Sequence, residues 1–384
     1  MKDAFPRGQT AIVGAATYGI GEAPGFSSMD LAVLASSKAL QQAGLKPSDV
    51  DGVFVATPDD MLSGLTLSDY LGIHPKVTDN NRTGGSAFLT HMMWAALALT
   101  TGQCNVALVA YGSNQRSASG KLMTPFRPSV YEQPYKPLSP ASSYALATAR
   151  HMHQYGTTRE HLGAVALAAR AWAQLNPEAS VRTPLDMQTY MGSRMVSEPL
   201  SVLDCCLISD GAAAIVMTRS DRAKDLSATP VHLLGVAAET THREIASMPD
   251  LTVTGAKLSG ARAFAQAGYK PSDIDVVELY DAFTINTILF LEDLGFCKKG
   301  EGGAFVQGGR IAPGGSLPVN TNGGGLSCVH PGMYGLFTVV EAVQQLGGQC
   351  GERQVANARL ALAHGNGGVL SSQVTAILGT SETV

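Results

Sequence analysis

The sequence predicts an α/β protein made of two similar halves, and an internal repeat is the first evidence. Residues 39–53 read ALQQAGLKPSDVDGV and residues 263–277 read AFAQAGYKPSDIDVV, with ten identities in fifteen positions. Each copy has an alanine-rich helical run that ends near a glycine, then a Lys-Pro-Ser-Asp turn, then apolar strand residues. We therefore predict that one supersecondary unit occurs twice.

A second pair of segments supports the duplication. Residues 87–104 form an apolar helical run that closes on Gly-Gln-Cys and leads to VALVAYG, while residues 336–350 close on Gly-Gln-Cys and lead to LALAHG. This alignment places Tyr111 opposite His364. Because the copies lie far apart in the chain, the repeat indicates two matched halves rather than a solenoid.

Strand and helix signals alternate along the chain, beginning with an expected strand at 10–15, a helix at 28–44 and a strand at 52–56. Residues 83–115 lack charged side chains, and we interpret them as a buried helix and strand rather than a membrane span. A proline- and tyrosine-rich insertion with its own helices follows at about 116–205, and a strand at 212–217 completes the first half. The alternation predicts mixed or mostly parallel sheets covered by helices, in halves at 1–228 and 229–384.

Composition narrows the function classes. The chain has 384 residues, 27 Lys plus Arg and 31 Asp plus Glu, without dense basic runs, so nucleic-acid binding has little support. Its six cysteines, including the adjacent Cys205 and Cys206, show no zinc-ligand spacing, and we interpret most of them as small apolar residues. The N-terminal residues carry charges and no continuous apolar stretch, which favours a cytoplasmic protein.

Three segments of the second half together concentrate glycine, histidine, asparagine and tyrosine. They are ELYDAF at 278–283, NTNGGG at 320–325 running into HPGMYG at 330–335, and HGNGG at 364–368. Each follows or ends an expected strand, and ligands of α/β sheets gather at such places. These segments are therefore the candidate functional site.

Together with the duplication and the SDGAAA turn, these segments resemble the thiolase superfamily along nearly the whole chain. ELYDAF is especially similar to the sterol-carrier-protein-X-type thiolases and their thiolase-like steroid side-chain aldolase relatives. The resemblance implies two βαβαβαββ-type halves in a layered α-β-α-β-α body. It also implies a homodimer and, by likeness to the aldolases, a small partner protein of the OB-fold, domain-of-unknown-function type.

The resemblance further implies two catalytic cysteines, and this chain has neither. Arg82 or Thr83 stands at the position of the nucleophile, and His364 or Gly365 stands at the position of the second cysteine. A hydroxyl such as that of Thr83 is a far weaker nucleophile than a thiolate. Cys328 is the one thiol close to these motifs in the sequence.

We therefore expect an acid–base site without a cysteine nucleophile. The expected catalytic residues are Tyr280, Tyr334, His330, His364 and Asp281. The expected substrate or oxyanion contacts are Asn322, Gly324, Gly365, Gly367 and Thr83, and no metal is expected. Asp281 could instead cap the helix that follows it.

The leading hypothesis is a thiolase-like aldolase that cleaves a β-hydroxyacyl-CoA thioester, for example a steroid side-chain CoA, by a retro-aldol reaction. Coenzyme A would be part of the substrate, with no permanently bound cofactor. One alternative is a thiolase-type acetyl-CoA acetyltransferase with Cys328 as a displaced nucleophile. Another is a non-catalytic subunit that binds CoA thioesters.

Overall fold

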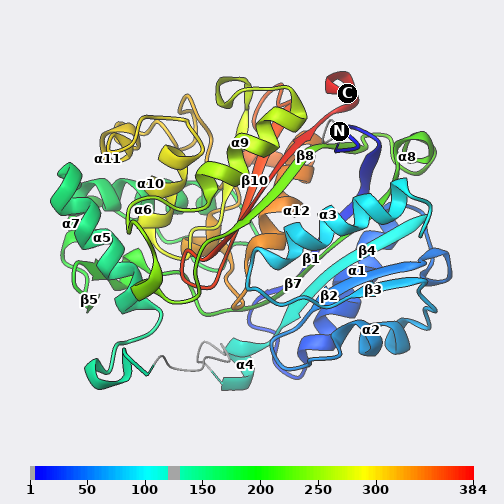
Figure 1. The fold of residues 1–384 in the computed structure, drawn as a ribbon, viewed down its shortest axis with the longest axis horizontal. Helices are drawn as coiled ribbons and strands as arrows, with labels where there is room; N and C mark the ends of the chain where they lie inside the picture. The colour runs from blue at the N-terminus through cyan, green and yellow to red at the C-terminus, as the bar shows by residue number, and fades with distance from the viewer. Residues whose placement is uncertain (1–4, 120–129) are drawn as a thin grey trace.

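A computed structural model describes residues 5–119 and 130–384, and its main feature is one large mixed sheet (Figure 1). The strand order in this sheet is β3-β2-β4-β7-β1-β8-β11-β10-β9. The strands are β1 Thr10–Gly21, β2 Gly52–Ala56, β3 Val77–Asp79, β4 Val106–Ser113, β7 Asp210–Arg219, β8 Val231–Thr240, β9 Val276–Leu279, β10 Leu360–Gly367 and β11 Ser372–Gly379, with β5 Met195–Ser197 and β6 Leu200–Ser201 in a separate ribbon.

The order of the strands is symmetric about the junction of β1 with β8. In the first half β1 pairs antiparallel with β7, and β7 pairs antiparallel with β4. In the second half β8 pairs antiparallel with β11, and β11 pairs antiparallel with β10. β4 and β10 then pair in parallel with β2 and β9, the strands that follow the repeated Lys-Pro-Ser-Asp turn. The predicted duplication is thus confirmed. The edge of the sheet differs between the halves, because a single parallel bridge between Val277 and Val319 stands where the first half has β3.

The described helices surround and separate the two halves of the sheet. They are α1 Ser28–Gln42, α2 Ser63–Leu71, α3 Ala87–Thr100, α4 Gln115–Ser119, α5 Ala141–Tyr155, α6 Arg159–Gln174, α7 Met187–Met191, α8 Ser220–Leu226, α9 Ala256–Ala267, α10 Thr284–Asp293, α11 Gly302–Phe305 and α12 Gly335–Leu346. None of the described helices is long and apolar enough to cross a membrane.

The helices α3 and α12 form the central layer of the molecule. Both contact each other and strands of both halves, whereas α1 packs on the outer side of the first half and α9 on the outer side of the second (Figure 1). The expected α-β-α-β-α layering follows from this arrangement. The charge-free sequence of α3 is explained by its place, because a helix enclosed between two sheet halves has no broad face in water.

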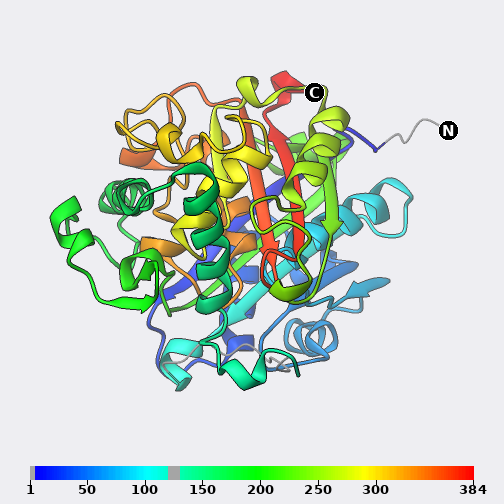
Figure 2. The same cartoon turned by 60° about the vertical axis from the view of Figure 1, so that its left-hand side comes forward.

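The insertion contributes α5, α6 and α7, which lie together on one side of the molecule (Figure 2). α5 and α6 pack against α10 of the second half. A buried contact of 3.0 Å between His151 Nε2 and Glu292 Oε2 joins α5 to α10, and Lys299 Nζ lies 3.0 Å from the same carboxylate oxygen. The predicted insertion therefore packs onto the second half, although its residues 120–129 lie outside the described residues.

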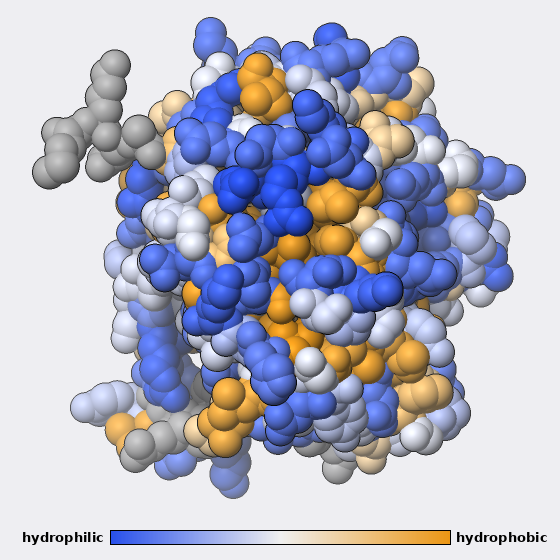
Figure 3. Space-filling model, turned by 90° about the vertical axis from the view of Figure 1, so that its right-hand side faces the viewer, coloured by the Kyte–Doolittle hydropathy of each residue, from blue (hydrophilic) through white to orange (hydrophobic). Residues whose placement is uncertain are grey.

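The opposite face carries exposed apolar residues. Figure 3 shows the side of the molecule at the right of Figure 1, with apolar side chains across its middle. Met61, Leu62, Leu65 and Tyr70, on or beside α2, are each more than half exposed. On the same side β3 is an edge strand of the large sheet.

The register of the strands corrects one detail of the sequence alignment, the pairing of Tyr111 with His364. Gly52 of β2 pairs with Ala107 of β4, and its repeat partner Val276 of β9 pairs with Ala361 of β10. Counting four residues onward from each pair places Tyr111 opposite Gly365. The alignment was wrong by one residue, which in a strand moves a side chain to the other face of the sheet.

Tyr111 projects into the central layer, where its ring centroid lies 4.9 Å from that of Phe88 and 6.4 Å from that of Phe337. Its hydroxyl donates a hydrogen bond to the Pro331 carbonyl and accepts one of 3.2 Å from the Met333 N–H. One buried side chain of the first half thus fixes the HPGM segment of the second.

We predict that Tyr111→Phe destabilises the protein by about 1–3 kcal/mol, because it leaves a buried carbonyl and a buried N–H without partners. Urea unfolding measures the change. Tyr18→Phe is the control, since Tyr18 is 36% exposed. An unfolding free energy for Tyr111→Phe equal to that of the control would contradict the role of this contact.

Candidate functional site

The structure brings Tyr280 and His330 into direct contact where the two halves meet. Tyr280 directly follows β9, and its backbone N–H bonds the His364 carbonyl at 3.0 Å, which continues the sheet to the last residue before the site. The hydroxyl of Tyr280 lies 3.0 Å from Nε2 of His330. The Tyr280 ring packs on the backbone at the start of α3, where any side chain at Gly85 would overlap the ring.

His330 is held through its backbone and leaves one ring nitrogen free. Its N–H donates to Ser209 Oγ at 2.9 Å, and its carbonyl accepts from Gln115 Nε2 at 3.0 Å. Nδ1 of the buried ring has no hydrogen-bond partner among the described residues. Burial lowers the pKa of His330 to about 4, so the imidazole is neutral at pH 7 and can accept a proton.

Tyr280 keeps its proton at neutral pH. Burial, with a smaller contribution from Cys206, raises the pKa of Tyr280 well above its ordinary value. A phenol in this state does not act as a base alone. It can pass a proton to the neutral His330 while it takes one from a bound hydroxyl group.

Tyr334 lies beside this pair with its hydroxyl engaged. Its ring centroid is 5.8 Å from that of Tyr280 and 5.7 Å from that of Phe337. Its hydroxyl donates to Asn322 Oδ1 at 2.9 Å, and the same oxygen accepts from the Gly324 N–H at 2.7 Å. Asn322 and Gly324, expected as substrate contacts, therefore use these groups within the protein.

Asp281 supports the turn next to His330 rather than capping a helix. Its carboxylate accepts from the N–H groups of Gly325 at 2.6 Å and Leu326 at 3.4 Å, in the π-helical turn Gly324–Cys328. The residue before α10 is Phe283, and no side chain caps that helix. Burial raises the pKa of Asp281 to about 7.

The structure does not bring the His364 side chain to the Tyr280–His330 pair. Its ring lies against Phe290 of α10 at 4.5 Å, on the outer side of β10. Nδ1 lies 2.9 Å from Thr375 Oγ1 and Nε2 lies 2.8 Å from Gln373 Oε1, so both ring nitrogens are engaged. Because the amide oxygen accepts, the proton of the ring lies on Nε2. Burial lowers the pKa of His364 to about 4.

The remaining candidates lie where β10 meets the start of α3. Thr83 Oγ1 is 3.1 Å from Ser86 Oγ, which donates to Ser372 Oγ at 3.0 Å. A side chain at Gly367 would overlap the Thr83 carbonyl, and one at Gly365 would lie 2.8 Å from Leu89. These glycines bring the strand against the N-terminus of α3, whose helix dipole favours negative charge close to Tyr280.

Sequence reasoning missed two residues close to this site. Tyr144 of α5 stacks on Phe283 with ring centroids 4.3 Å apart, and its hydroxyl accepts from Asn366 Nδ2 at 2.9 Å. Cys206 lies within electrostatic range of Tyr280, and burial raises the pKa of its thiol well above the ordinary value. The only sequence signal for Tyr144 was its place in a long insertion, and for Cys206 there was none.

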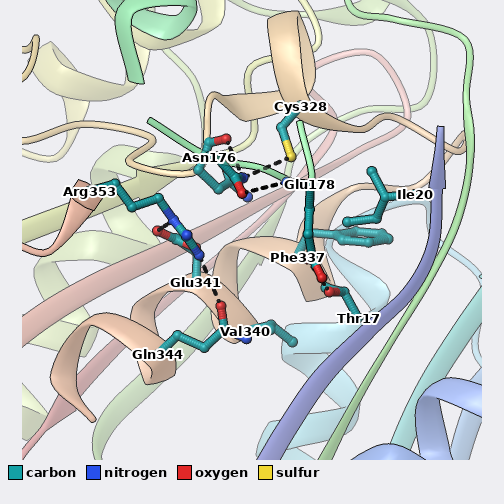
Figure 4. Close-up of a pocket in the computed structure, with 11 residues that line it drawn as sticks. Thr17, Ile20, Asn176, Glu178, Cys328, Phe337, Val340, Glu341, Gln344 and Arg353 are labelled. Carbon is teal, nitrogen blue, oxygen red and sulfur yellow. Dashed lines mark hydrogen bonds and ion pairs between the residues drawn. The ribbon is translucent and has the colours of Figure 1, made fainter. Parts of the chain in front are cut away.

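Cys328 has its thiol contact with Asn176 and not with the Tyr280–His330 pair among the described residues. Its thiol faces a small cavity between β1 and α12 that is also lined by Thr17, Asn176, Phe337 and Arg353 (Figure 4). Asn176 Nδ2 lies 3.5 Å from its sulfur. Burial raises the pKa of the thiol well above its ordinary value, so Cys328 lacks the features of an activated nucleophile. Among the described residues no cluster of His, Cys, Asp and Glu could hold a metal ion.

The fold and this site define a thiolase-like protein whose thiols are not activated. Residues 237–380 match the family model described as "Thiolase C-terminal domain-like". The chain is 34% identical to the 17-hydroxy-3-oxo-4-pregnene-20-carboxyl-CoA lyase of Mycobacterium tuberculosis, over 89% of this chain and 92% of that one. It is 33% identical to an acetyl-CoA acetyltransferase of Methanothermobacter thermautotrophicus, over 93% and 96%.

Among solved structures, the Ltp2-ChsH2(DUF35) aldolase matches with a TM-score of 0.89 and 33% identity, over 97% of this chain and 98% of that one. The chain belongs to the thiolase superfamily, in the branch that includes steroid side-chain-cleaving aldolases. The predicted resemblance and the predicted fold are therefore confirmed.

Asp281 gives a testable pH dependence of stability. Its pKa in the folded protein, about 7, is higher than its ordinary value of 3.8, so its favourable contribution is complete below pH 3.8 and is lost as pH rises through about 7. We predict that the unfolding free energy of the wild type falls by a few kcal/mol as pH rises between these values, and that this fall is absent in Asp281→Asn. Chemical unfolding at a series of pH values measures this, with Asp69→Asn, on α2, as control. Parallel curves for wild type and Asp281→Asn would refute the assignment.

Proposed function

We propose that the protein is a carbon–carbon lyase that cleaves a β-hydroxyacyl-CoA thioester by a retro-aldol reaction, without a covalent acyl-enzyme. The observation that carries this proposal is the buried pair of Tyr280 and neutral His330, 3.0 Å apart. The nearby thiols are protonated and lack a histidine partner among the described residues. The names of the relatives support the same reaction class.

In the proposed reaction the β-hydroxyl of the substrate gives its proton to the Tyr280 oxygen, while Tyr280 passes its own proton to Nε2 of His330. The bond between the α and β carbons then breaks. Its electrons form the thioester enolate, and the former β-carbon becomes a ketone or aldehyde. The N-terminus of α3 favours the negative charge, and the proton returns through Tyr280 to the α-carbon. Free coenzyme A is not consumed.

We further propose that the acyl group is a steroid side chain, since relatives that match over most of their length are named as a steroid side-chain-cleaving aldolase and a pregnene-carboxyl-CoA lyase. Coenzyme A is then part of the substrate. We also propose a cytoplasmic location and a small OB-fold partner, the latter supported by the similarity to the Ltp2-ChsH2(DUF35) aldolase. The exposed apolar residues around α2 beside the edge strand β3 support a homodimer. A monomeric mass by light scattering would overturn the dimer.

The activity test compares two substrate sets. We expect turnover of a steroid β-hydroxyacyl-CoA in the absence of free coenzyme A, and turnover only of a β-ketoacyl-CoA with added coenzyme A would refute the proposal.

Tyr280→Phe should lower kcat by about 10²–10⁴-fold, because it removes the proton relay. Tyr135→Phe is the matched control, since Tyr135 is 85% exposed. Wild-type rates in Tyr280→Phe would remove Tyr280 from the reaction.

The second candidate function is an acyltransferase, favoured by the similarity to the acetyl-CoA acetyltransferase. Such an enzyme needs an acyl-cysteine, and the available thiols near the site are Cys206 and Cys328. We predict no acyl adduct by mass spectrometry after incubation with an acyl-CoA. An adduct that disappears in Cys328→Ala or Cys206→Ala would establish the acyltransferase. Tight thioester binding without any turnover would instead identify a non-catalytic subunit.

A further inference from the structure

A buried carboxyl group lies close to the site, and the proposed reaction does not use it. Glu278 belongs to β9, two residues before Tyr280, so both side chains project to the same face of the strand. Glu278 is fully buried. Its Oε1 accepts from the Thr321 N–H at 3.1 Å and lies 2.8 Å from Thr321 Oγ1, while Oε2 has no partner among the described residues.

The Thr321 hydroxyl touches a second carboxyl group. Its Oγ1 lies 2.7 Å from Glu341 Oε1 and accepts from Gln345 Nε2 at 2.9 Å. Arg353 binds Glu341 with two N–H groups, each 3.0 Å from a carboxylate oxygen. Glu341 therefore has a bidentate cation and is held as a carboxylate.

The hydrogen atoms can be counted from these contacts. A hydroxyl has one proton, so Thr321 cannot donate to Glu278 and Glu341 at the same time. If Thr321 donates to the ionised Glu341, the short distance to Glu278 requires a proton on Glu278 Oε1 that is donated to Thr321. If Glu278 and Glu341 were both ionised, one of their two short contacts with Thr321 Oγ1 would have no proton between the oxygen atoms. Such a contact is unfavourable in a region that excludes water.

The charges that face this cluster lead to the same result. Glu341 and Arg353 form one neutral pair, and Cys350 Sγ lies 3.7 Å from Glu341 Oε1. Asp281 and Tyr334 lie on the site side and bring no positive charge. Burial, and next the charge of Glu341, raise the pKa of Glu278 well above its ordinary value.

We propose that Glu278 is a neutral carboxylic acid in the working enzyme and acts as a positioning residue for Tyr334, which packs against the reacting Tyr280. Through Thr321 it fixes the turn whose next residue, Asn322, holds the Tyr334 hydroxyl. Its neutrality also keeps a second negative charge away from the phenols and from the enolate. The effect on rate rests on the proposed function, whereas the protonation state does not.

Infrared spectroscopy tests the protonation state without any substrate. Asp281→Asn serves as the background, because the Asp281 carboxyl also titrates near neutral pH. At pH 7 we expect a carbonyl band of a protonated carboxylic acid that disappears on adding Glu278→Gln and persists on adding Glu341→Gln. A spectrum in which Glu278→Gln removes only carboxylate bands overturns the proposal.

The pH dependence of kcat tests the effect on the site. Glu278→Gln replaces one neutral group by another, so we expect the alkaline limb of kcat to stay in place even if the rate falls. If Glu278 were ionised, Glu278→Gln would remove a buried negative charge and lower the pKa of the nearby phenols. A shift of the alkaline limb to lower pH by about one unit or more would therefore overturn the proposal. If no β-hydroxyacyl-CoA is turned over, the proposed function fails, and the infrared result still decides the state of Glu278.

Discussion

The site depends on the close approach of backbone segments where the two halves meet. The Tyr280 ring lies on Gly85 at the start of α3, and a side chain at Gly335, at the start of α12, would overlap the Gly85 carbonyl. Side chains larger than hydrogen would separate α3, α12 and the end of β9. Because this approach excludes water, it places Tyr280 and His330 in an environment of low polarity. The packing of the halves therefore determines the protonation states at the site.

Those protonation states agree with the absence of cysteine from the two catalytic thiol positions of a cysteine-dependent thiolase. Burial raises the pKa values of Cys206 and Cys328 and so keeps them as thiols, which disfavours either one as a substitute nucleophile. The same burial lowers the pKa of His330 and makes it a neutral acceptor. One physical cause, the cost of a charge in a dry site, disfavours the covalent route and favours a proton relay through Tyr280.

The sequence predicted the fold well because its signals were local and repeated. The repeated helix-turn-strand unit identified both halves, and the positions of Tyr280 and His330 followed from motifs at strand ends. His364 was a different case, since only the pairing of β10 with β9 and β11 decides which face its ring takes. Asp281 was ambiguous because its partner, the Gly325 N–H, is distant in the chain. Contacts of this kind are set by tertiary packing and leave no local pattern.

The dependence of kcat/KM on pH tests most directly whether buried, neutral groups carry out the reaction. Because the pKa of His330 is about 4 and that of Tyr280 is raised well above its ordinary value, the profile of Asp281→Asn should be level from about pH 6 to pH 8, with its acid limb near pH 4 and its alkaline limb above the ordinary tyrosine pKa. An inflection near the ordinary histidine value of about 6.5 that persists in Asp281→Asn, which lacks the neighbouring carboxyl group with a pKa of about 7, would show that His330 is not held in the buried, neutral state described here and would contradict this account.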